Sequence, residues 1–383
     1  MKKTFGIALI LTLSISVGCI SCEPSYNYQI PKQTKDGWQT ASLDDVGIKK
    51  NKLGDLVNLI RRKKYQNIHS LLIIKDGKLV FEEYFDGYLW DPEYDRFRGK
   101  YIKFNLYTKH NIMSVAKAFT SALVGIAIDH GFIHSVDEKL FSFFSEYALQ
   151  KHERKSNITL EHLLTMTSGL QWNEWDVPIS DESNDIRQLF IVSDPIEYIL
   201  AKSVLHEPGT YWYYSGGDVT LLGEVIRGTT DLRIDDFAEQ YLFKPLGIEE
   251  YEWGKLNLEI IHASGHLHLS PRNMAKFGYL ILNNGVWKNT RIISEKWLKA
   301  TTSEYIKIPG RAWEGDRFGY QWWLKSYFVG SKRVEAIVRS GWGGQAIILL
   351  PGFDLVVVFT GGNYVDKDPV NEFVAQYIIP SVN

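Results

Sequence analysis

The chain has 383 residues, of which 45% are hydrophobic and 23% charged, so it can bury a sizeable core and is neither disordered nor fibrous. Its formal net charge of -2 offers no basic surface for nucleic acid and no broad attraction to anionic lipid. At this length we expect two domains, or one large domain with an insertion.

The first 22 residues have the pattern of a signal peptide, because two lysines precede a short apolar run from 5 to 17. That run is shorter than the roughly 20 apolar residues that a membrane-spanning helix needs. The two cysteines of the chain, Cys19 and Cys22, both follow a small residue, and Gly18-Cys19 resembles the lipobox of bacterial lipoproteins. We therefore predict a protein of the cell envelope, periplasmic or extracytoplasmic, with membrane anchoring through a lipidated Cys19 or Cys22. Ordinary signal cleavage beside incidental cysteines is the alternative.

Residues 23–40 are polar and contain two prolines, which predicts a linker, and residues 41–383 then form the folded domain. Within that domain, residues 42–62 are predicted to be largely helical, since apolar residues recur on one side. Two β-rich runs then flank Asp76-Gly77, the preferred pair for a tight hairpin turn.

A second hairpin is predicted near the other end of the chain, where residues 345–350 and 355–359 flank Pro351-Gly352-Phe353-Asp354. After it, Asp368 can cap a helix that begins at Pro369 and has one apolar face.

Between the hairpins the chain is mainly helical and rich in turns, with no internal repeat. These elements predict an antiparallel sheet assembled from both ends of the chain and flanked by helices. The middle, about 121–265, would form a second, mainly helical lobe, and the cleft between the lobes is a usual place for a site.

The strongest chemical signal is Ser114-Val115-Ala116-Lys117, at the start of a helix predicted over residues 114–130. Serine and lysine three residues apart lie on one face of a helix. A serine hydroxyl is a poor nucleophile unless a base takes its proton, and a lysine can do so only when it is neutral. Burial and a positive potential favour that neutral form. The spacing alone also fits a capping serine followed by a surface lysine.

Further motifs follow Ser-x-x-Lys along the chain, at residues 165–170, 208–218, 221–223 and 269–278. With them, the chain from about residue 37 to its C-terminus resembles the serine β-lactamase-related family. That family groups class C β-lactamases, D-alanyl-D-alanine carboxypeptidases, D-aminopeptidases, family VIII esterases and 6-aminohexanoate-dimer hydrolases. The resemblance implies the β-lactamase/transpeptidase-like fold, an α/β (α+β) arrangement of an antiparallel sheet flanked by helices plus a helical lobe. It implies no cofactor and no metal.

The resemblance also implies roles for single residues. Ser114 matches the acylated nucleophile and Lys117 its partner base. Tyr214 matches the tyrosine of the Tyr-x-Asn motif, which shuttles the proton, and Tyr213 is the alternative. A phenol with a pKa near ~10 needs positive neighbours to act as a base. Gly216 stands where that motif has the asparagine that helps β-lactamases hold the substrate amide.

Arg339-Ser340-Gly341 is the nearest match to the third family motif, Lys-Thr-Gly or His-x-Gly, which lies on a strand at the edge of the site. The arginine keeps a positive charge but differs from lysine in bulk and geometry. An N–H near Gln345, together with that of Ser114, would form the oxyanion hole. The glycines after Trp342 would let backbone approach the substrate, or they shape a bulge before a strand. The substrate-binding and oxyanion residues implied by the resemblance are Arg339, Gly341, Trp342, Gly344 and Gln345.

Two other groups of side chains are candidates of lower rank. Five tryptophans close to the motifs could shape an acyl or alcohol pocket: Trp172, Trp175, Trp212, Trp323 and Trp342. His262, His266 and His268 include a His-x-His pair that could bind metal, but we expect structural or surface histidines because Glu259 is the one acid close by. The chain has no Gly-x-Ser-x-Gly, P-loop or His-Glu-x-x-His motif.

The sequence therefore predicts a metal-free serine hydrolase acting on a small-molecule ester, amide or peptide, through an acyl-enzyme on Ser114 with Lys117 and Tyr214 as base. Alternatives are D-aminopeptidase, carboxypeptidase or β-lactamase-like activity, and a non-catalytic envelope binding protein that uses the same cleft. Gly216 and Arg339, at the positions of the family's asparagine and lysine, favour an esterase or small-amide hydrolase over a β-lactamase.

Overall fold

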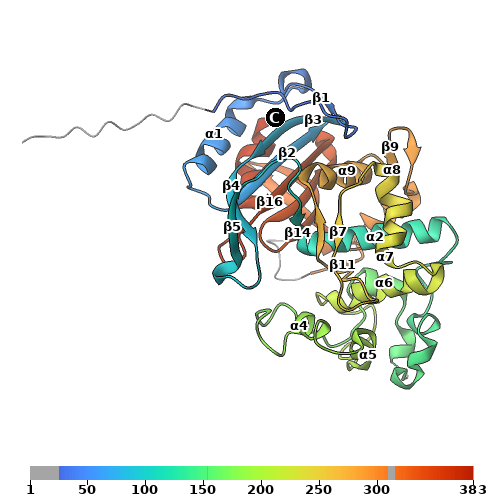
Figure 1. Ribbon diagram of the computed structural model, residues 1–383. Coiled ribbons are helices and arrows are strands. Elements are labelled where there is room, and N and C mark those ends of the chain that lie inside the picture. Colours follow the sequence, from blue (N-terminus) through green and yellow to red (C-terminus); the bar gives the residue numbers. More distant parts are fainter. Residues whose placement is uncertain (1–25, 153, 309–314, 383) are drawn as a thin grey trace, which may run out of the picture.

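The computed structural model describes residues 26–152, 154–308 and 315–382, so the predicted signal peptide and both cysteines lie outside the described residues. Within these ranges the main sheet has nine strands in the order β1-β3-β2-β16-β15-β14-β13-β12-β11. All neighbouring strands run antiparallel except β1 and β3. Strands from the two ends of the chain meet where β2 pairs with β16. The predicted antiparallel sheet assembled from both ends is confirmed (Figure 1).

The strands of the main sheet are β1 (Gln39–Thr40), β2 (Ile68–Lys75), β3 (Lys78–Tyr84), β11 (Ile306–Lys307), β12 (Arg317–Phe318), β13 (Trp323–Val329), β14 (Lys332–Gly341), β15 (Gln345–Leu350) and β16 (Leu355–Gly361). The short strands outside it are β4 (Asp86–Trp90), β5 (Arg98–Lys103), β6 (His110–Asn111), β7 (Glu252–Trp253), β8 (Leu267–Leu269), β9 (Val286–Trp287) and β10 (Thr290–Arg291). The helices are α1 (Lys50–Arg61), α2 (Ala116–Asp129), α3 (Leu160–Leu164), α4 (Asp185–Leu189), α5 (Pro195–Ala201), α6 (Gly216–Thr230), α7 (Ile234–Ala238), α8 (Lys244–Leu246), α9 (Pro271–Leu282), α10 (Glu295–Thr301), α11 (Val370–Phe373) and α12 (Ile379–Ser381).

The first predicted hairpin forms at the expected residues. Asp76 and Gly77 have φ angles of 52° and 73°, the left-handed conformation that a two-residue turn of this kind needs at both positions. The second hairpin also forms, with a 3₁₀ turn at Pro351–Phe353 between β15 and β16.

Helices cover both faces of the main sheet. On one face α9 packs on β15 and β16 so closely that a Cβ on Gly278 would lie 2.8 Å from Ile347 and from Val356. On the other face α1 packs with the C-terminal helices, and Phe373 contacts Phe359 of β16. The result is the predicted α/β sandwich.

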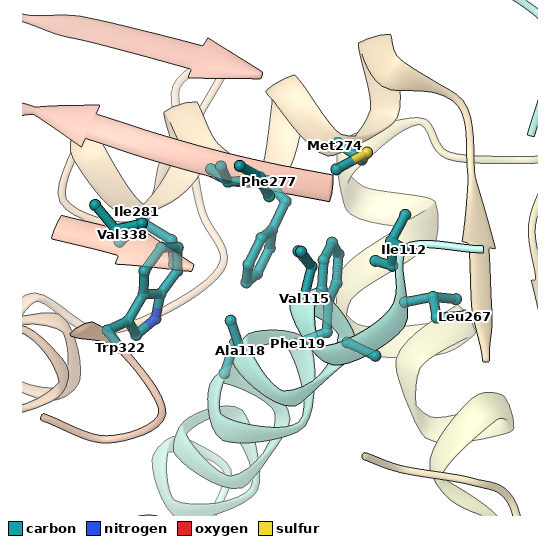
Figure 2. Packing of buried hydrophobic residues seen from close by; sticks show 14 of the residues in the cluster. Ile112, Val115, Ala118, Phe119, Leu267, Met274, Phe277, Ile281, Trp322 and Val338 are labelled. Atoms are coloured by element: carbon teal, nitrogen blue, oxygen red, sulfur yellow. The ribbon is translucent and has the colours of Figure 1, made fainter. Parts of the chain in front are cut away.

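A shared apolar core joins the sheet to α2 (Figure 2). Phe119 of α2 stacks on Phe277 of α9 at 3.7 Å between ring centroids, and Phe277 in turn stacks on Trp322 at 6.3 Å. Ile112, just before α2, is fully buried in the same core. This packing fixes the start of α2 against the sheet, where the candidate nucleophile lies.

Two predicted helices differ in detail from the structure. The first is a 3₁₀ turn at Asp44–Val46 and then α1, because Gly47 adopts φ 72° and interrupts the helix. In the last, Pro369 occupies the N-cap position, and Asp368 accepts a hydrogen bond from the N–H of Val370 at 2.9 Å. That helix continues through a π-helical segment, Val374–Ile378, into α12.

The prediction of a linker up to residue 40 is wrong for residues 26–40, which pack on the domain. The Tyr26 hydroxyl donates to Glu83, the Tyr28 hydroxyl donates to the carbonyl of Val80, and Trp38 is 2% exposed. Aromatic side chains among polar residues cause the difference, because burying them stabilises the packed conformation.

The helices of the described ranges are all too short or too polar to cross a bilayer. Helices α4, α5 and α6 lie together below α2, which runs between them and the main sheet (Figure 1).

Candidate active site

Ser114 lies in a 3₁₀ turn, Met113–Val115, that leads directly into α2. Met113 before it has φ 50°, a left-handed conformation that is unusual for a residue other than glycine, and its N–H donates to the Asn111 side chain at 3.0 Å. Such strained backbone is concentrated at functional sites. The turn leaves Ser114 half-buried at the start of a helix whose side chains from 116 to 127 are buried.

Lys117 is the partner of Ser114, as its spacing predicts. Its Nζ lies 3.0 Å from the Ser114 Oγ and 2.9 Å from the carbonyl oxygen of Ser264, and the residue is 1% exposed. The same nitrogen lies 4.8 Å from the centroid of the Tyr214 ring. The structure therefore brings Ser114, Lys117 and Tyr214 together.

Arg339 joins this group from the sheet, on β14. It is fully buried and donates three hydrogen bonds: to the carbonyl of Ser114 at 2.8 Å, to that of Gln321 at 2.9 Å and to the Tyr214 hydroxyl at 3.1 Å. All three acceptors are uncharged groups. No carboxylate of the described residues forms an ion pair with Arg339. A guanidinium in such surroundings stabilises negative charge that develops on the phenol oxygen. We call Ser114, Lys117, Tyr214 and Arg339 the site cluster.

Tyr213, the alternative to Tyr214, points elsewhere: its hydroxyl donates to Asp176. Tyr214 instead stacks on Trp175 with 4.0 Å between ring centroids and an interplanar angle of 17°. The rings of Trp212 and Trp323 also lie next to Trp175, with 6.1 and 6.2 Å between ring centroids.

Glu174 is a residue of the site that the sequence analysis missed. One oxygen lies 3.7 Å from the Lys117 Nζ, and the other accepts hydrogen bonds from the N–H of Gly216 at 2.6 Å and from the indole of Trp172 at 2.9 Å. It lies in a loop 57 residues after Lys117, where no periodic pattern could point to it. The sequence offers one signal: Gly216 stands where the family motif has an asparagine, so another side chain can fill the space of that asparagine.

The turn between β14 and β15 contains the other predicted residues. A Cβ on Gly341 would lie 3.1 Å from the Ser114 nitrogen, so this backbone passes directly beside the serine. Gly344 has φ 88°. Trp342 is 40% exposed and donates to the carbonyl of Tyr364 at 2.8 Å. The Gln345 side chain is buried. It donates a hydrogen bond to the Gly361 carbonyl and accepts one from the Gly361 N–H, so it joins β15 to β16.

Asp218, in the first turn of α6, is the most shifted carboxyl group beside the site. Burial disfavours its charged form and raises the pKa of Asp218 to about 7, and the nearby Glu174 adds to the effect. Its side chain accepts a hydrogen bond from the Ser168 hydroxyl at 2.9 Å. The contact ties the loop of the 165–170 motif to the helix that follows Tyr214.

The three histidines considered as metal ligands do not form a metal site. His262 is fully buried and shares a hydrogen bond with the Ser264 hydroxyl at 2.9 Å, and burial holds its pKa well below the ordinary value. His268 lies on β8, whereas His266 precedes that strand with φ 52°. In the part of the chain that the structure describes, no group of three or more His, Cys, Asp or Glu is arranged to hold a metal ion.

Two surface hollows, of about 480 and 610 Å³, lie beside the end of α1 and the β4–β5 hairpin. Ser114, Lys117 and Tyr214 do not line either of them. Ser114 itself is half-buried, so part of the residue is accessible to solvent.

The chain is similar to several known proteins. The chain is 24% identical over 317 residues to an uncharacterised protein of Alkalihalophilus pseudofirmus. The aligned residues cover 76% of this chain and 82% of that protein. Among solved structures, a Bacillus anthracis protein assigned as a 6-aminohexanoate-dimer hydrolase has a TM-score of 0.69 at 20% identity, over 92% of this chain and 89% of the other. A family VIII carboxylesterase has a TM-score of 0.64 at 18% identity, over 85% and 96%.

These structural likenesses establish the fold. The family described as beta-lactamase matches residues 67–376, which is most of the chain. The chain therefore belongs to the beta-lactamase family and has its serine-hydrolase fold.

Proposed function

We propose that this protein hydrolyses ester or small amide bonds through an acyl-enzyme on Ser114. The observation that carries the proposal is the 3.0 Å contact between the Ser114 Oγ and the Lys117 Nζ, at the start of a buried helix. A nucleophile within hydrogen-bond distance of its base is the arrangement that acyl transfer requires. Tyr214, held by Arg339 beside the same lysine, supplies a second group that can carry the proton.

In the first step the Ser114 oxygen bonds to the substrate carbonyl carbon, and its proton passes to the Lys117–Tyr214 pair. Negative charge then forms on the carbonyl oxygen, where the N–H of Ser114 and an N–H near Gln345 would stabilise it. As the intermediate collapses, the bond to the leaving group breaks and Tyr214 returns the proton to the departing alcohol or amine. Water then bonds to the acyl carbon while the pair takes one of its protons. The bond between the Ser114 oxygen and the acyl carbon breaks as the pair gives that proton to Ser114, and the carboxylic acid leaves.

Two departures from the β-lactamase motifs favour esters and small amides over lactams. Gly216 has no side chain to hold a lactam amide, and Glu174 occupies the space beside it. Arg339 replaces the motif lysine and is turned inward, with its donors used by Ser114, Gln321 and Tyr214.

A fluorophosphonate probe, which reacts with activated serines, tests the proposal. We expect the wild-type protein to be labelled and to turn over p-nitrophenyl esters, and Ser114→Ala to lose both by about 1000-fold or more. Equal labelling of the two proteins would refute the hydrolase and favour a non-catalytic binding protein. Efficient cleavage of a chromogenic cephalosporin without ester turnover would refute the preference for esters.

A further inference from the structure

The two surface hollows beside the end of α1 and the β4–β5 hairpin form one continuous groove, because Tyr65, Gln66 and Arg98 line both of them. Four lysine and arginine residues line the first hollow and four line the second, and Arg98 is common to both, so seven basic side chains surround the groove. We call the residues that line the two hollows the basic groove. Its acidic residues are fewer: Asp86, Asp366 and Glu372.

Much of the positive charge in the basic groove has no carboxylate beside it. Asp366 pairs with Arg96 at 2.5 Å and with Arg98 at 3.3 Å. The ion pairs of the described residues do not include three other cations of the groove, Lys63, Lys64 and Lys103. A hollow lined by an excess of one sign of charge attracts ligands of the opposite sign.

The same sign of charge continues along the outer face of α1. Residues 49–64 carry seven lysines and arginines and one acid, Asp55, and all eight are exposed. The apolar side of α1 is buried against the domain, so the charged side is the one that faces solvent. The net charge of -2 is therefore unevenly distributed, and at physiological salt a charge acts over only about 10 Å, so the local excess decides what this face attracts.

Two exposed tyrosines lie among these cations. Tyr88 and Tyr101, on the paired strands β4 and β5, are 36% and 51% exposed and lie 4.9 Å apart between ring centroids. The Arg98 guanidinium lies 5.5 Å from the Tyr88 ring. Tyrosine is favoured at the boundary between an apolar phase and water, where its ring and its hydroxyl meet different surroundings. Three acids of the hairpin do not line the hollows, and they mark the end of this surface: Asp91, Glu93 and Asp95.

The N-terminal end of the described chain joins the domain beside the basic groove. The N–H of Tyr26 donates to the Asn58 side chain of α1 at 2.9 Å, and Arg61, which lines the groove, lies 5.1 Å from the Tyr26 ring centroid. Cys19 stands seven residues before Tyr26. At about 3.5 Å per residue, a lipid on either of the predicted cysteines would hold Tyr26 within about 25 Å of a bilayer.

We propose that the basic groove and the outer face of α1 dock on the surface of a bilayer that contains anionic phospholipid. The lysine and arginine side chains contact the lipid phosphates, and the rings of Tyr88 and Tyr101 lie among the headgroups. Docking fixes the orientation of the domain on the membrane, which an attachment at the N-terminal end alone does not. Helix α1, β4 and β5 lie together at the left of Figure 1, at the opposite side of the molecule from α5 and α6, which therefore face away from the membrane. The proposal does not depend on the hydrolase activity.

Co-sedimentation of the full chain with vesicles tests the proposal. The wild type should bind vesicles of phosphatidylcholine mixed with phosphatidylglycerol more tightly than vesicles of phosphatidylcholine alone, and added salt should reduce that gain. The groove variant combines Lys63→Gln, Lys64→Gln and Lys103→Gln. Its partition onto the mixed vesicles should fall by about 5-fold for each lysine, and its partition onto the neutral vesicles should stay unchanged.

A control variant removes the same number of charges outside the groove, through Lys151→Gln, Lys296→Gln and Lys299→Gln. These lysines are exposed and do not line either hollow. The control should bind the mixed vesicles as the wild type does. Both variants should keep the wild-type melting temperature, which separates a loss of docking from a loss of structure.

Three outcomes would overturn the proposal. Equal binding of the wild type to neutral and mixed vesicles would show that anionic headgroups are not recognised. Equal losses in the groove variant and the control variant would assign the effect to the net charge of the chain. Binding of the wild type to heparin without any gain on the mixed vesicles would show that the basic groove holds a soluble polyanion instead of a membrane.

Discussion

The site cluster differs from a second buried group, formed by His69, His110 and Phe104, which we call the histidine cluster. The two differ in whether their side-chain nitrogen atoms form hydrogen bonds. In the site cluster the Arg339 guanidinium donates to three oxygens, and Lys117 faces three more. In the histidine cluster the rings stack, with His69 on Phe104 at 3.9 Å and Phe104 on His110 at 4.8 Å. Neither ring nitrogen of His69 has a hydrogen-bond partner among the described residues.

The difference determines which cluster can hold charge. Acceptors around Lys117 and Arg339 replace the hydrogen bonds to water that burial removes. Burial without acceptors holds the pKa of His69 well below its ordinary value and lowers the pKa of His110 to about 3. We infer that the first arrangement serves the reaction, and that the second serves packing while making stability depend on pH.

Of the predictions that test this comparison, the largest expected effect is a loss of ester turnover when the site cluster is changed. Arg339→Met should lower ester turnover by about 100-fold or more, because Tyr214 loses the donor that orients it and stabilises its negative charge. Stability should change far less: three acceptors lose a partner, at about 1 kcal/mol each, but a buried charge without a carboxylate partner is also removed. Activity and chemical denaturation of the same preparation measure both quantities.

Arg339→Lys sharpens this comparison, because it keeps the charge without the three-way geometry. It should retain more turnover than Arg339→Met. Equal activity of wild type and Arg339→Met would show that the buried guanidinium has no part in the reaction.

The next largest effect concerns the histidine cluster. We expect the free energy of unfolding to fall in acid because its two histidines are buried in the neutral form. The folded pKa values of His69 and His110 lie below the unfolded value of about 6.5, so below that pH the unfolded chain binds more protons. The contribution of each ring is complete above pH 6.5 and falls as the pH drops below 6.5, by about 1.4 kcal/mol per pH unit. The difference in free energy of unfolding in urea between the wild type and a variant with phenylalanine at both His69 and His110, measured between pH 7.5 and 5, isolates this slope from that of other shifted groups such as Asp218. A difference that stays constant over this range would contradict neutral burial.

The sequence predicts the parts of the molecule that local patterns encode. Asp76-Gly77 specifies its turn through the φ angles that it tolerates, and the apolar repeat after Ser114 specifies α2. The i, i+3 spacing then places Lys117 beside the serine. The family resemblance points to Tyr214, counted back from residues 221–223, and to Arg339, in the nearest match to the third motif.

Contacts between distant loops were not predictable in this way. Glu174 meets Lys117 because the loop after α3 folds back over α2, and no local pattern records that path. The packing of Tyr26 and Trp38 was missed for the opposite reason: the polar residues around them predict a linker, although the half-buried Tyr26 and the buried Trp38 outweigh that preference. Composition describes an average, whereas burial depends on single large side chains.

The smallest effect should come from His69→Phe, the change that most directly separates packing from titration. A phenyl ring can stack on Phe104 as the imidazole does, and the His69 ring has no hydrogen bond to the described residues that could be lost. At pH 7.5 the free energy of unfolding should therefore change by less than about 1.5 kcal/mol, while its slope below pH 6.5 falls by about 1.4 kcal/mol per pH unit. His134→Gln, at an exposed histidine, is the control and should leave the slope unchanged. A His69→Phe slope equal to that of the wild type would mean that this ring is protonated in the folded protein, and the contrast with the site cluster would fail.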